Sequence, residues 1–447
     1  MLEIKFIREN TEKIKEAAKN KNIDLDIDRL LILDEERRKV QAKIDNLRQE
    51  RKKIAKINGK NKPSKEQIKA GKELKEEITK LEENFRQIDN ELIELLVKVP
   101  TIPSSDTPIG KDDSENVEIL RWGEPPKFTF RAKSYIELGR DLDLLDLERG
   151  VKVAGYRGYY LKNEAVFLTI AMMMYALEKL TSRGFTPMIP PTLVREFALF
   201  GSGYFNGKKY NPKVDEIYKI ANEEIEADGR HNKEDKFLIG TAEPSLLAYY
   251  ADEILDEKRL PLKLCGFSQC YRSEIGSYGK DTKGIYRVHE FMKVEQVCLS
   301  RANIKEADKI HQEMVKISRE MHEELGLPYR ILQICTGDMS AGKYKMFDIE
   351  AWLPSRNGYG ETGSASNFLD WQARRLNVKY QTAEGQKKYV YMLNNTALAS
   401  ARTLISILEN HQREDGSVTV PKVLRKYMPT DMHIIKTKRP TLNDVFK

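Results

Sequence analysis

Two heptad runs of apolar residues near the N-terminus constrain the fold more than any other feature of the sequence. The first covers residues 30–54, where apolar residues recur at alternating steps of three and four, with Arg37 and Arg51 at the two remaining seam positions. The second covers residues 74–99 with the same rhythm. This spacing places an apolar stripe on each of two helices. Stripes of equal length joined by a short turn bury each other most simply in an antiparallel helical hairpin.

The segment between the runs, residues 58–64, reads Asn-Gly-Lys-Asn-Lys-Pro-Ser and carries helix-stop and turn signals. Ser64 is the expected N-cap of the second helix. A linker with three prolines at residues 100–108 then marks a boundary, after which strand and helix patterns mix. We therefore predict a helical-hairpin arm at 1–105 and a mixed α+β domain at 106–447.

The basic residues of the chain are concentrated in this arm. Residues 37–69 contain thirteen Lys and Arg but only three acidic residues, a net charge of +10, whereas the whole chain carries +7. Such a local excess predicts contact with a polyanion, most simply a nucleic-acid backbone. Two alternatives stay open at this point: a solvated basic helix surface, and a coiled coil used for oligomerisation.

Composition sets aside several other classes of protein. The four cysteines are too scattered for a disulfide framework and have no zinc-site spacing, which favours a reduced intracellular compartment. The N-terminus has charges where a signal peptide needs an apolar run. The longest apolar stretch, residues 165–177, is shorter than the roughly 20 residues that span a bilayer, and its methionines 172–174 are expected in a helix core. No P-loop, HExxH or EF-hand pattern occurs.

One pair of segments in the second domain combines groups suited to a nucleotide. Residues 267–274 and 286–295 alternate like strands, and the connection between them is polar and rich in glycine. An antiparallel hairpin here brings an arginine, two glutamates and a phenylalanine onto one platform. A guanidinium pairs with phosphate and an aromatic ring stacks on a base. The alternative is an ordinary hairpin with a cross-strand ion pair.

Three motifs in order give this hairpin a context. Arg272-x-Glu274 with its return Arg287-x-His289-x-Phe291 resembles motif 2 of the class II aminoacyl-tRNA synthetases. Residues 183–191 are similar to motif 1 of that class, a helix and strand at the dimer interface. Residues 398–404 are similar to motif 3, whose arginine meets ATP.

Within that class the sequence resembles the seryl-tRNA synthetases. Gly-Thr-Ala-Glu at 240–243, the run 272–279 and the basic hairpin carry this resemblance, which extends essentially from end to end. It implies a seven-stranded antiparallel sheet flanked by helices, in a cytoplasmic homodimer without a membrane segment. It also implies a two-step reaction, in which serine and ATP form seryl-adenylate and the serine then passes to tRNA(Ser). Whether tRNA(Sec) is also charged stays open.

The resemblance implies a set of site residues. Its ATP contacts are Arg272, Ser273, Glu274, Val288, Phe291, Glu361, Thr362, Gly363, Ser364 and Arg402, of which Arg272 and Arg402 are catalytic. Its serine contacts are Thr241, Ala242, Glu243, Arg272, Glu295 and Thr396. Mg²⁺ would be held by Glu361 and Ser364, and no zinc is expected. Its tRNA contacts are Arg37, Arg38, Arg48, Arg51, Lys52, Lys53 and Lys56.

Roles follow from the same resemblance. Arg272 would hold the α-phosphate, Arg402 the γ-phosphate, and Glu274 the adenine amino group, while Phe291 would stack on the adenine ring. For Arg402 the alternative is an ion pair with Glu409, two helical turns further on.

The sequence also departs from the family pattern. Ala-Ser-Ala at 399–401 stands where glycines are usual, and Thr362-Gly363 replaces an Ile/Val-Ser pair, which leaves open which group there meets the phosphates. Tyr135 stands where many relatives have histidine, and we interpret it as structural.

Three other functions remain as hypotheses: a paralogue that loads a carrier protein, a class II synthetase for another small amino acid, and a nucleic-acid or scaffold protein with an inactive nucleotide site.

Overall fold

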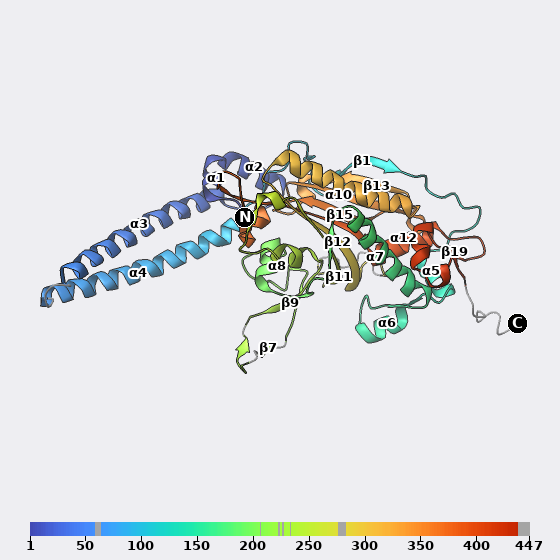
Figure 1. Cartoon of the computed structure of the whole chain (residues 1–447), viewed down its shortest axis with the longest axis horizontal. Coiled ribbons are helices and arrows are strands. Elements are labelled where there is room, and N and C mark those ends of the chain that lie inside the picture. Colours follow the sequence, from blue (N-terminus) through green and yellow to red (C-terminus); the bar gives the residue numbers. More distant parts are fainter. Residues whose placement is uncertain are drawn as a thin grey trace. The chain divides into compact units, whose positions relative to one another are not determined.

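The computed structural model divides the chain into two compact units, Met1–Ile102 and Pro103–Lys447 (Figure 1). It describes residues 1–58, 64–205, 207–221, 224–225, 228–232, 234–275 and 283–436, without the side chains of 55–58, 224 and 232. Three features named in the sequence therefore lie outside the described residues: the turn at 59–63, the side chain of Lys56 and most of the motif 2 connection.

The first unit is helical, and two long helices dominate it. Its helices are α1 (Ile4–Glu9), α2 (Thr11–Asn20), α3 (Ile27–Asn58) and α4 (Lys65–Leu96). Helices α3 and α4 lie side by side as a hairpin, in two shades of blue in Figure 1. Ser64 begins α4 with a capping box, in which its hydroxyl accepts from the Gln67 amide and its own amide donates to the Gln67 side chain. The predicted hairpin and N-cap are both confirmed.

The arm is held together by an apolar cluster at one end and by ion pairs along its length. The cluster consists of Ile7, Ile14, Ile27, Leu30, Leu33, Leu92, Leu96 and Val99. Arg37 donates to Asp89 at 2.6 Å across the hairpin and its guanidinium lies 5.3 Å from the Phe85 ring centre. Arg48 pairs with Glu82 at 2.8 Å. Exposed pairs of this kind stabilise by only about 0–1 kcal/mol each, but they fix the register of the two helices.

Three arginines that the family resemblance had assigned to tRNA binding also form ion pairs within the arm. Arg37 and Arg48 bridge the two helices, and Arg38 pairs with the buried carboxylate of Asp34 at 3.1 Å. Arg51 and Lys52, nearer the end of α3, are exposed, as is Lys53. Among the described side chains, these last three form no ion pair within the arm.

The second unit is built on a sheet that has eight strands among the described residues. In spatial order the strands are β1 (Val117–Trp122), β13 (Tyr329–Gln333), β14 (Lys345–Leu353), β15 (Gly358–Asn367), β18 (Tyr391–Ala399), β12 (Glu290–Ser300), β11 (Leu262–Tyr271) and β4 (Thr186–Met188). All neighbours are antiparallel except β4 and β11, which are parallel. The predicted antiparallel sheet is confirmed, with one parallel neighbour at its β4 edge, but the expected count of seven strands was wrong. Strand β4 joins the edge after a helix rather than through a hairpin, so no tight turn forces it to run antiparallel.

Helices flank this sheet, and short sheets extend it. The helices are α5 (Tyr135–Asp141), α6 (Leu147–Ala154), α7 (Glu164–Ser182), α8 (Glu196–Ser202), α9 (Glu243–Ala248), α10 (Ile304–Glu324), α11 (Trp371–Leu376) and α12 (Ser400–Asn410). The 3₁₀ turns are η1 (Asp113–Glu115), η2 (Glu257–Arg259), η3 (Thr336–Asp338), η4 (Pro354–Arg356), η5 (Lys422–Tyr427) and η6 (Pro429–Asp431). The remaining strands are β2 (Leu145–Asp146), β3 (Tyr160–Leu161), β5 (Leu193–Arg195), β6 (Tyr218–Lys219), β7 (Glu224–Ile225), β8 (His231–Asn232), β9 (Lys236–Leu238), β10 (Ile254–Asp256), β16 (Lys379–Gln381), β17 (Lys387–Tyr389), β19 (Val418–Thr419) and β20 (Ile434–Ile435).

Strand alternation gives the two faces of the sheet different surroundings. On β12, Val294 and Cys298 belong to the large core that also contains residues of α7, α10 and α12. Gln296 lies on the same face and donates to Ser318 of α10 at 3.1 Å. Lys293 and Glu295 point to the opposite face, because successive side chains of a strand alternate. Charged groups therefore gather at one end of that second face, and further along it Val297 and Leu299 pack in a second apolar core with residues of α9 and α11.

Helix α7 combines a buried side with an apolar outer side. It is the one helix among the described residues that is long and apolar enough to cross a membrane by length and composition, and half of that window is buried in the fold. Met172 and Met173 are buried as expected. The expectation for Met174 was wrong, because it is 48% exposed, on the same side as Phe167 and Ile170.

Candidate active site

An open pocket lies against the face of the sheet that carries Lys293. It is lined by Arg272, Glu274, Tyr286, Arg287, Val288, Phe291, Lys293, Glu361, Thr362, Gly363, Thr396, Ala399, Ala401 and Arg402. These residues come from the ends of β11 and β12 and the segment between them, from β15 and β18, and from the first turn of α12. A concave site with a few convergent charged groups beside aromatic rings suits a small-molecule ligand. Most of the residues predicted to bind ATP are thus brought together.

Arg272 immediately follows the last residue of β11. Its backbone amide donates to the His289 carbonyl at 3.0 Å, which continues the hairpin beyond the strand. Its Nε lies 3.3 Å from the Gly240 carbonyl, and its guanidinium lies 5.4 Å from the centre of the Phe291 ring. These contacts fix the arginine at the pocket wall next to the aromatic ring that was predicted to stack on a base.

Glu274 lies between two arginines. Its Oε2 accepts from Arg157 at 3.1 Å and from Arg287 at 3.4 Å, and its side chain is 9% exposed. The backbone at Glu274 has a φ of 53°, in the left-handed region that non-glycine residues seldom adopt. Such strain persists where the surroundings dictate the conformation, and here the two guanidinium groups hold the carboxylate. Arg157 is a contact that the sequence had not indicated.

Arg402 faces the pocket from the first turn of α12 and binds Glu361 twice. Its Nη1 lies 3.0 Å from the Glu361 carboxylate and donates to the Glu361 carbonyl at 3.1 Å. Burial opposes ionisation of Glu361, but the charge of Arg402 holds the pKa of that carboxyl below its usual value. The alternative pairing of Arg402 with Glu409 was wrong, because Glu409 accepts hydrogen bonds from other groups.

Oxygen donors suited to Mg²⁺ lie beside this pair. Asp348 of β14 faces Ser364 of β15 in the strand register, and its Oδ1 is buried without a hydrogen-bond partner in the described part of the chain. Burial and the nearby charge of Glu361 raise the pKa of Asp348 well above its usual value, although the charge of Lys343 and a hydrogen bond from Ser364 oppose the shift. Two neighbouring carboxylates and a hydroxyl are hard ligands whose mutual repulsion a divalent cation would relieve. The residues present therefore fit the metal.

The departure at Thr362-Gly363 has a clear geometry. The Thr362 hydroxyl lies 2.8 Å from Nε2 of His322 and 3.1 Å from the Ile349 carbonyl, so it is engaged on the helix side of the sheet. Gly363 lies so close to β18 that a Cβ there would come within 3.2 Å of the Thr396 carbonyl oxygen. Thr362 thus lines the pocket with its backbone while its hydroxyl is held by α10.

The departure in motif 3 is also accommodated. The Ser400 hydroxyl accepts from the Met292 amide at 3.0 Å, and Ala399 and Ala401 are small, buried residues of the pocket wall. The predicted strand followed by a helix is confirmed as β18 and α12.

A second group of predicted residues surrounds the buried carboxylate of Glu243, at the start of α9. The side-chain amides of Gln372 and Asn394 each donate to its Oε1 at 2.7 Å, and the Tyr204 hydroxyl lies 3.4 Å from its Oε2. Burial, with a contribution from the charge of Glu295, raises the pKa of Glu243 to about 7. Neutral donors thus satisfy this carboxylate without neutralising its charge.

Glu295 is compensated differently. Its Oε2 lies 2.6 Å from Nζ of Lys293, and both side chains are nearly inaccessible to solvent. The Thr396 hydroxyl lies 3.4 Å from the same oxygen, within reach of a hydrogen bond. Lys293 and Glu295 are neighbours on one face of β12, so alternation places them together as the sequence indicated.

Other predicted residues support these groups. Thr241 is buried and its Oγ1 lies 3.4 Å from the Glu243 amide, while Ala242 packs against the backbone of Gly266. The Ser273 hydroxyl is buried and has no hydrogen-bond partner among the described residues, and Val288 is a buried residue of the pocket wall. Ser273, Ser364, Thr241, Ala242, Glu243 and Glu295 do not line the pocket itself.

Alternation predicted Lys293 on the same face of β12 as Glu295, but not as the partner of that carboxylate. Four other partners of the site residues were not predicted: Arg157, Asp348, Gln372 and Asn394. One of these had a signal, since Asn394 alternates with Thr396 along β18. The others come from elements whose pairing is visible only in the fold. Over the described part of the chain, no group of three or more His, Cys, Asp or Glu gathers as a metal site, and the four cysteines are buried free thiols.

Both units match known families. Residues 1–103 match the seryl-tRNA synthetase N-terminal domain, and residues 218–411 match the tRNA synthetase class II core domain (G, H, P, S and T). A serine–tRNA ligase of Borrelia garinii subspecies bavariensis is 43% identical over 96% of this chain and 98% of its own length. One from Treponema denticola is 40% identical over 96% of this chain and 99% of its own.

Solved structures agree. The seryl-tRNA synthetase of Pyrococcus horikoshii, complexed with ATP, superposes with a TM-score of 0.85 at 38% identity, over 98% of this chain and all of its own. The cytoplasmic serine–tRNA ligase of Naegleria fowleri, in complex with AMP, gives a TM-score of 0.81 at 31% identity over 96% of each chain. With an arm, a class II core and near full-length similarity, the chain belongs to the seryl-tRNA synthetase family.

Proposed function

We propose that the catalytic unit, residues 106–447, joins serine to ATP as seryl-adenylate and then transfers serine to tRNA. The observation that carries this proposal is the division of charge in the site. Two guanidinium groups, from Arg272 and Arg402, line a pocket for a polyanion, and two buried carboxylates, Glu243 and Glu295, lie beside it for an ammonium. An amino acid carries an ammonium group and a nucleoside triphosphate carries a polyanion, so the two substrates need those two environments side by side.

The first step is a displacement at phosphorus. The serine carboxylate attacks the α-phosphate, the bond to the bridging oxygen breaks, and pyrophosphate leaves. A carboxylate is already a nucleophile at neutral pH, so the site must supply positioning and neutralisation rather than a general base. Arg272 holds the α-phosphate, and Arg402 reaches the γ-phosphate from the opposite wall. Bound Mg²⁺, held by Glu361 and Ser364, would add neutralising charge on the phosphate oxygens.

The nucleoside end of ATP lies toward the hairpin in this proposal. Phe291 stacks on the adenine ring, with Val288 beside it, and Glu274 accepts from the adenine amino group. Arg157 and Arg287 keep the Glu274 carboxylate in place for that contact. A carboxylate held by two arginines keeps a fixed position, which suits it to accept a hydrogen bond from a donor on the base.

Serine specificity rests on hydrogen bonds that an alanine side chain leaves unmade. Glu243 takes the ammonium, and Glu295 with Thr396 takes the ammonium and hydroxyl. Thr241 and Ala242 complete the wall. Because Glu295 is buried, binding a substrate that lacks the hydroxyl leaves a polar group without its partner.

The second step needs tRNA, for which the arm at residues 1–105 is the proposed contact. A terminal ribose hydroxyl of tRNA(Ser) attacks the seryl carbonyl, and AMP leaves. The basic surface of α3 binds the RNA backbone, led by Arg51, Lys52, Lys53 and Lys56, with Arg37, Arg38 and Arg48 shared between RNA and the ion pairs of the arm. Reading of backbone and shape rather than base edges is expected for such a surface. Charging of tRNA(Sec) is a separate question.

A homodimer in the cytoplasm is part of this proposal, and the outer side of α7 supports the dimer. Phe167, Ile170 and Met174 are 48%, 42% and 48% exposed and follow steps of three and four along one side of the helix. Ile189 of motif 1, just after β4, is 84% exposed. The proposed dimer covers these exposed apolar side chains.

ATP–pyrophosphate exchange against all twenty amino acids, with and without Mg²⁺, tests the activity. Exchange should occur with serine alone and should require Mg²⁺.

Arg272→Gln should lower the exchange rate about 10²–10³-fold, because it removes charge stabilisation in the transition state. Arg140→Gln, at an exposed arginine, is the control and should leave the rate unchanged. Exchange with another amino acid would overturn the substrate. Absence of exchange from folded protein would favour a binding role, and aminoacylation of a carrier protein would favour the paralogue.

Serine binding should depend on pH through Glu243, which faces Glu295, Lys293, Lys343 and the Tyr204 hydroxyl. Its pKa of about 7 means that at lower pH an ammonium must displace a proton from the carboxyl. The KM for serine should therefore fall by up to about tenfold per pH unit as pH rises toward 7, then level off. The KM for ATP, measured alongside, should not follow this profile, and Glu243→Gln should abolish it.

The raised pKa of Glu243 also makes the free energy of unfolding depend on pH. The folded protein holds a proton on Glu243 that the unfolded chain loses above its ordinary pKa of 4.5, so this group's contribution to stability falls as pH rises from 4.5 to about 7. A KM for serine that is flat between pH 6 and 8 would contradict the role of Glu243.

The arm predicts a separation of the two steps. Lys52→Gln, Lys53→Gln and Lys56→Gln together should raise the KM for tRNA about tenfold or more. They should also lower the slope of log Kd for tRNA against log salt concentration by the equivalent of about three phosphate contacts. Serine-dependent exchange should be unchanged. Lys387→Gln with Lys388→Gln, two exposed lysines of the catalytic unit, is the control. Equal loss of both steps would contradict the proposed role of the arm.

The dimer is tested by charging its proposed interface. Phe167→Glu with Ile170→Glu should shift the protein from dimer to monomer in sedimentation velocity, because two charges would be desolvated at the contact. Ile109→Glu, at another exposed apolar residue, should leave the dimer intact. A wild-type protein that sediments as a monomer would refute this part of the proposal.

A further inference from the structure

Helix α12 carries two charged groups with different partners. Arg402 in its first turn faces the pocket, whereas Glu409 near its end is completely buried. The two oxygens of Glu409 accept three hydrogen bonds: from the Tyr135 amide at 2.9 Å, from the Ser355 amide at 2.9 Å and from the Ser355 hydroxyl at 2.7 Å. One helix thus links the pocket to the first residue of α5 and to the turn η4.

Tyr135 extends one of these links to the motif 2 return. Its hydroxyl accepts from the Ile285 amide at 3.0 Å and lies 3.4 Å from the Lys283 carbonyl, to which it donates. Gly284, between these two residues, has a φ of 78°, and a Cβ there would lie 1.8 Å from the Tyr135 hydroxyl. The backbone at 283–285 therefore closes around this one oxygen atom.

The next residue, Tyr286, lines the pocket between two arginines. The guanidinium carbon of Arg356 lies 4.0 Å from the ring centre, and that of Arg402 lies 4.7 Å from it. Nε of Arg402 also donates to the Tyr286 carbonyl at 3.3 Å. Arg356 directly follows Ser355, so both links from Glu409 lead to Tyr286.

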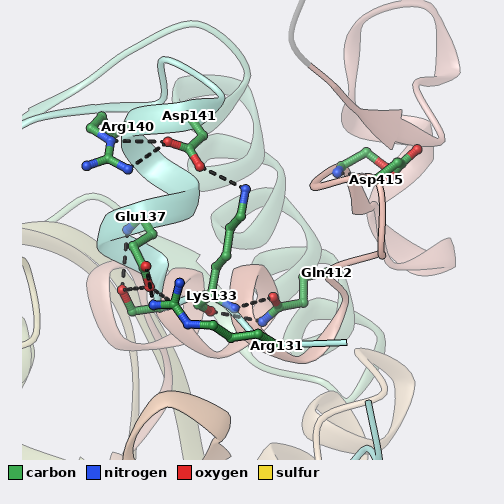
Figure 2. Close-up of polar contacts among 9 residues, drawn as sticks. Arg131, Lys133, Glu137, Arg140, Asp141, Gln412 and Asp415 are labelled. Atoms are coloured by element: carbon green, nitrogen blue, oxygen red, sulfur yellow. Dashed lines mark hydrogen bonds and ion pairs between the residues drawn. The ribbon is translucent and has the colours of Figure 1, made fainter. Parts of the chain in front are cut away.

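A second set of hydrogen bonds, between Lys133 and Gln412, holds the segment just before Tyr135 (Figure 2). The Gln412 side chain accepts from the Lys133 amide at 2.7 Å and donates to the Lys133 carbonyl at 3.0 Å. Ser134 and Glu137 then form a capping box that begins α5. Tyr135 is thus fixed in its backbone from both sides, which leaves its hydroxyl a defined position.

We infer that Tyr135, held by Glu409, is a positioning residue for the nucleotide side of the pocket. Its hydroxyl fixes the backbone at 283–285 and thereby keeps Tyr286 between Arg356 and Arg402, so that Arg402 presents its remaining donors to the phosphates. The inference rests on the proposed function for the identity of the nucleotide. It replaces the purely structural interpretation of Tyr135 that the sequence suggested.

The test is Tyr135→Phe, which keeps the ring and removes the hydroxyl. The KM for ATP in exchange and the Kd for ATP by equilibrium titration should both rise about tenfold, while the KM for serine should stay within twofold of wild type. Tyr175→Phe removes another buried tyrosine hydroxyl, which donates to Glu324 at 2.6 Å, and should change neither constant. A purely structural role would move both substrates together.

A second variant keeps the inference falsifiable if the first folds poorly. Glu409→Gln retains the shape with one acceptor oxygen fewer, and should raise the Kd for ATP in the same direction. The double variant should show less than the product of the two single effects, because both act through the same segment. An ATP Kd within twofold of wild type in both single variants, or equal rises for ATP and serine, would overturn the inference.

The ATP titration also distinguishes failure of the positioning role of Tyr135 from failure of the proposed function. If wild-type protein supports no exchange with any amino acid, the proposed function fails, yet the ratio of ATP Kd values between Tyr135→Phe and wild type still tests the positioning role.

Discussion

The cost of burying charge governs the catalytic unit. One face of its sheet carries several acidic side chains. Glu243 and Glu295 have little access to water, and an uncompensated ion at such a position would cost several kcal/mol. The site compensates its carboxylates in different ways. Arg402 neutralises the half-exposed Glu361 directly and Lys293 neutralises Glu295, whereas Glu243 receives hydrogen bonds from neutral amide and hydroxyl groups. Burial without a directly paired cation raises the pKa of Glu243. In the proposed function a substrate ammonium would supply the missing charge, so this part of the site would be electrostatically complete only when occupied.

Pairing also orients the arginines that line the pocket. They already have partners, so in the proposed function they would need no rearrangement to meet a phosphate. Preorganised charge of this kind stabilises a transition state. The partners themselves belong to elements behind the pocket. Glu409 anchors the start of α5 and the turn η4 to α12, and Thr362 is held by His322 of α10. Helices that fill the core on one face thus determine the side-chain geometry on the other.

Much of the fold could be predicted from periodicity and short motifs. Heptads indicated the α3–α4 hairpin, a serine at the right offset indicated its cap, and alternation placed Lys293 and Glu295 on one face of β12. The eighth strand, the parallel edge at β4 and the exposure of Met174 were not predicted, because they depend on which element packs beside which. The same holds for the site: Arg272 and Arg402 were recognised from motifs, but Arg157, Asp348 and Gln372 come from segments far apart in sequence whose contact no local pattern reveals.

Charge in the arm shows why counting residues overstates a binding surface. The excess of basic residues predicted one polyanion surface along α3, yet the helix uses part of it to hold α4. Arg37 and Arg48 bridge to acidic residues of the partner helix, and Arg38 pairs with a buried aspartate of its own helix. An arginine in an exposed pair can still exchange its carboxylate for a phosphate, but it must then give up a contact that sets the register of the hairpin. Binding of a polyanion to those arginines and the packing of the hairpin therefore compete, whereas Arg51, Lys52 and Lys53 can bind without that cost. The strongest electrostatic contribution to RNA binding should thus come from the end of α3 rather than from its whole length.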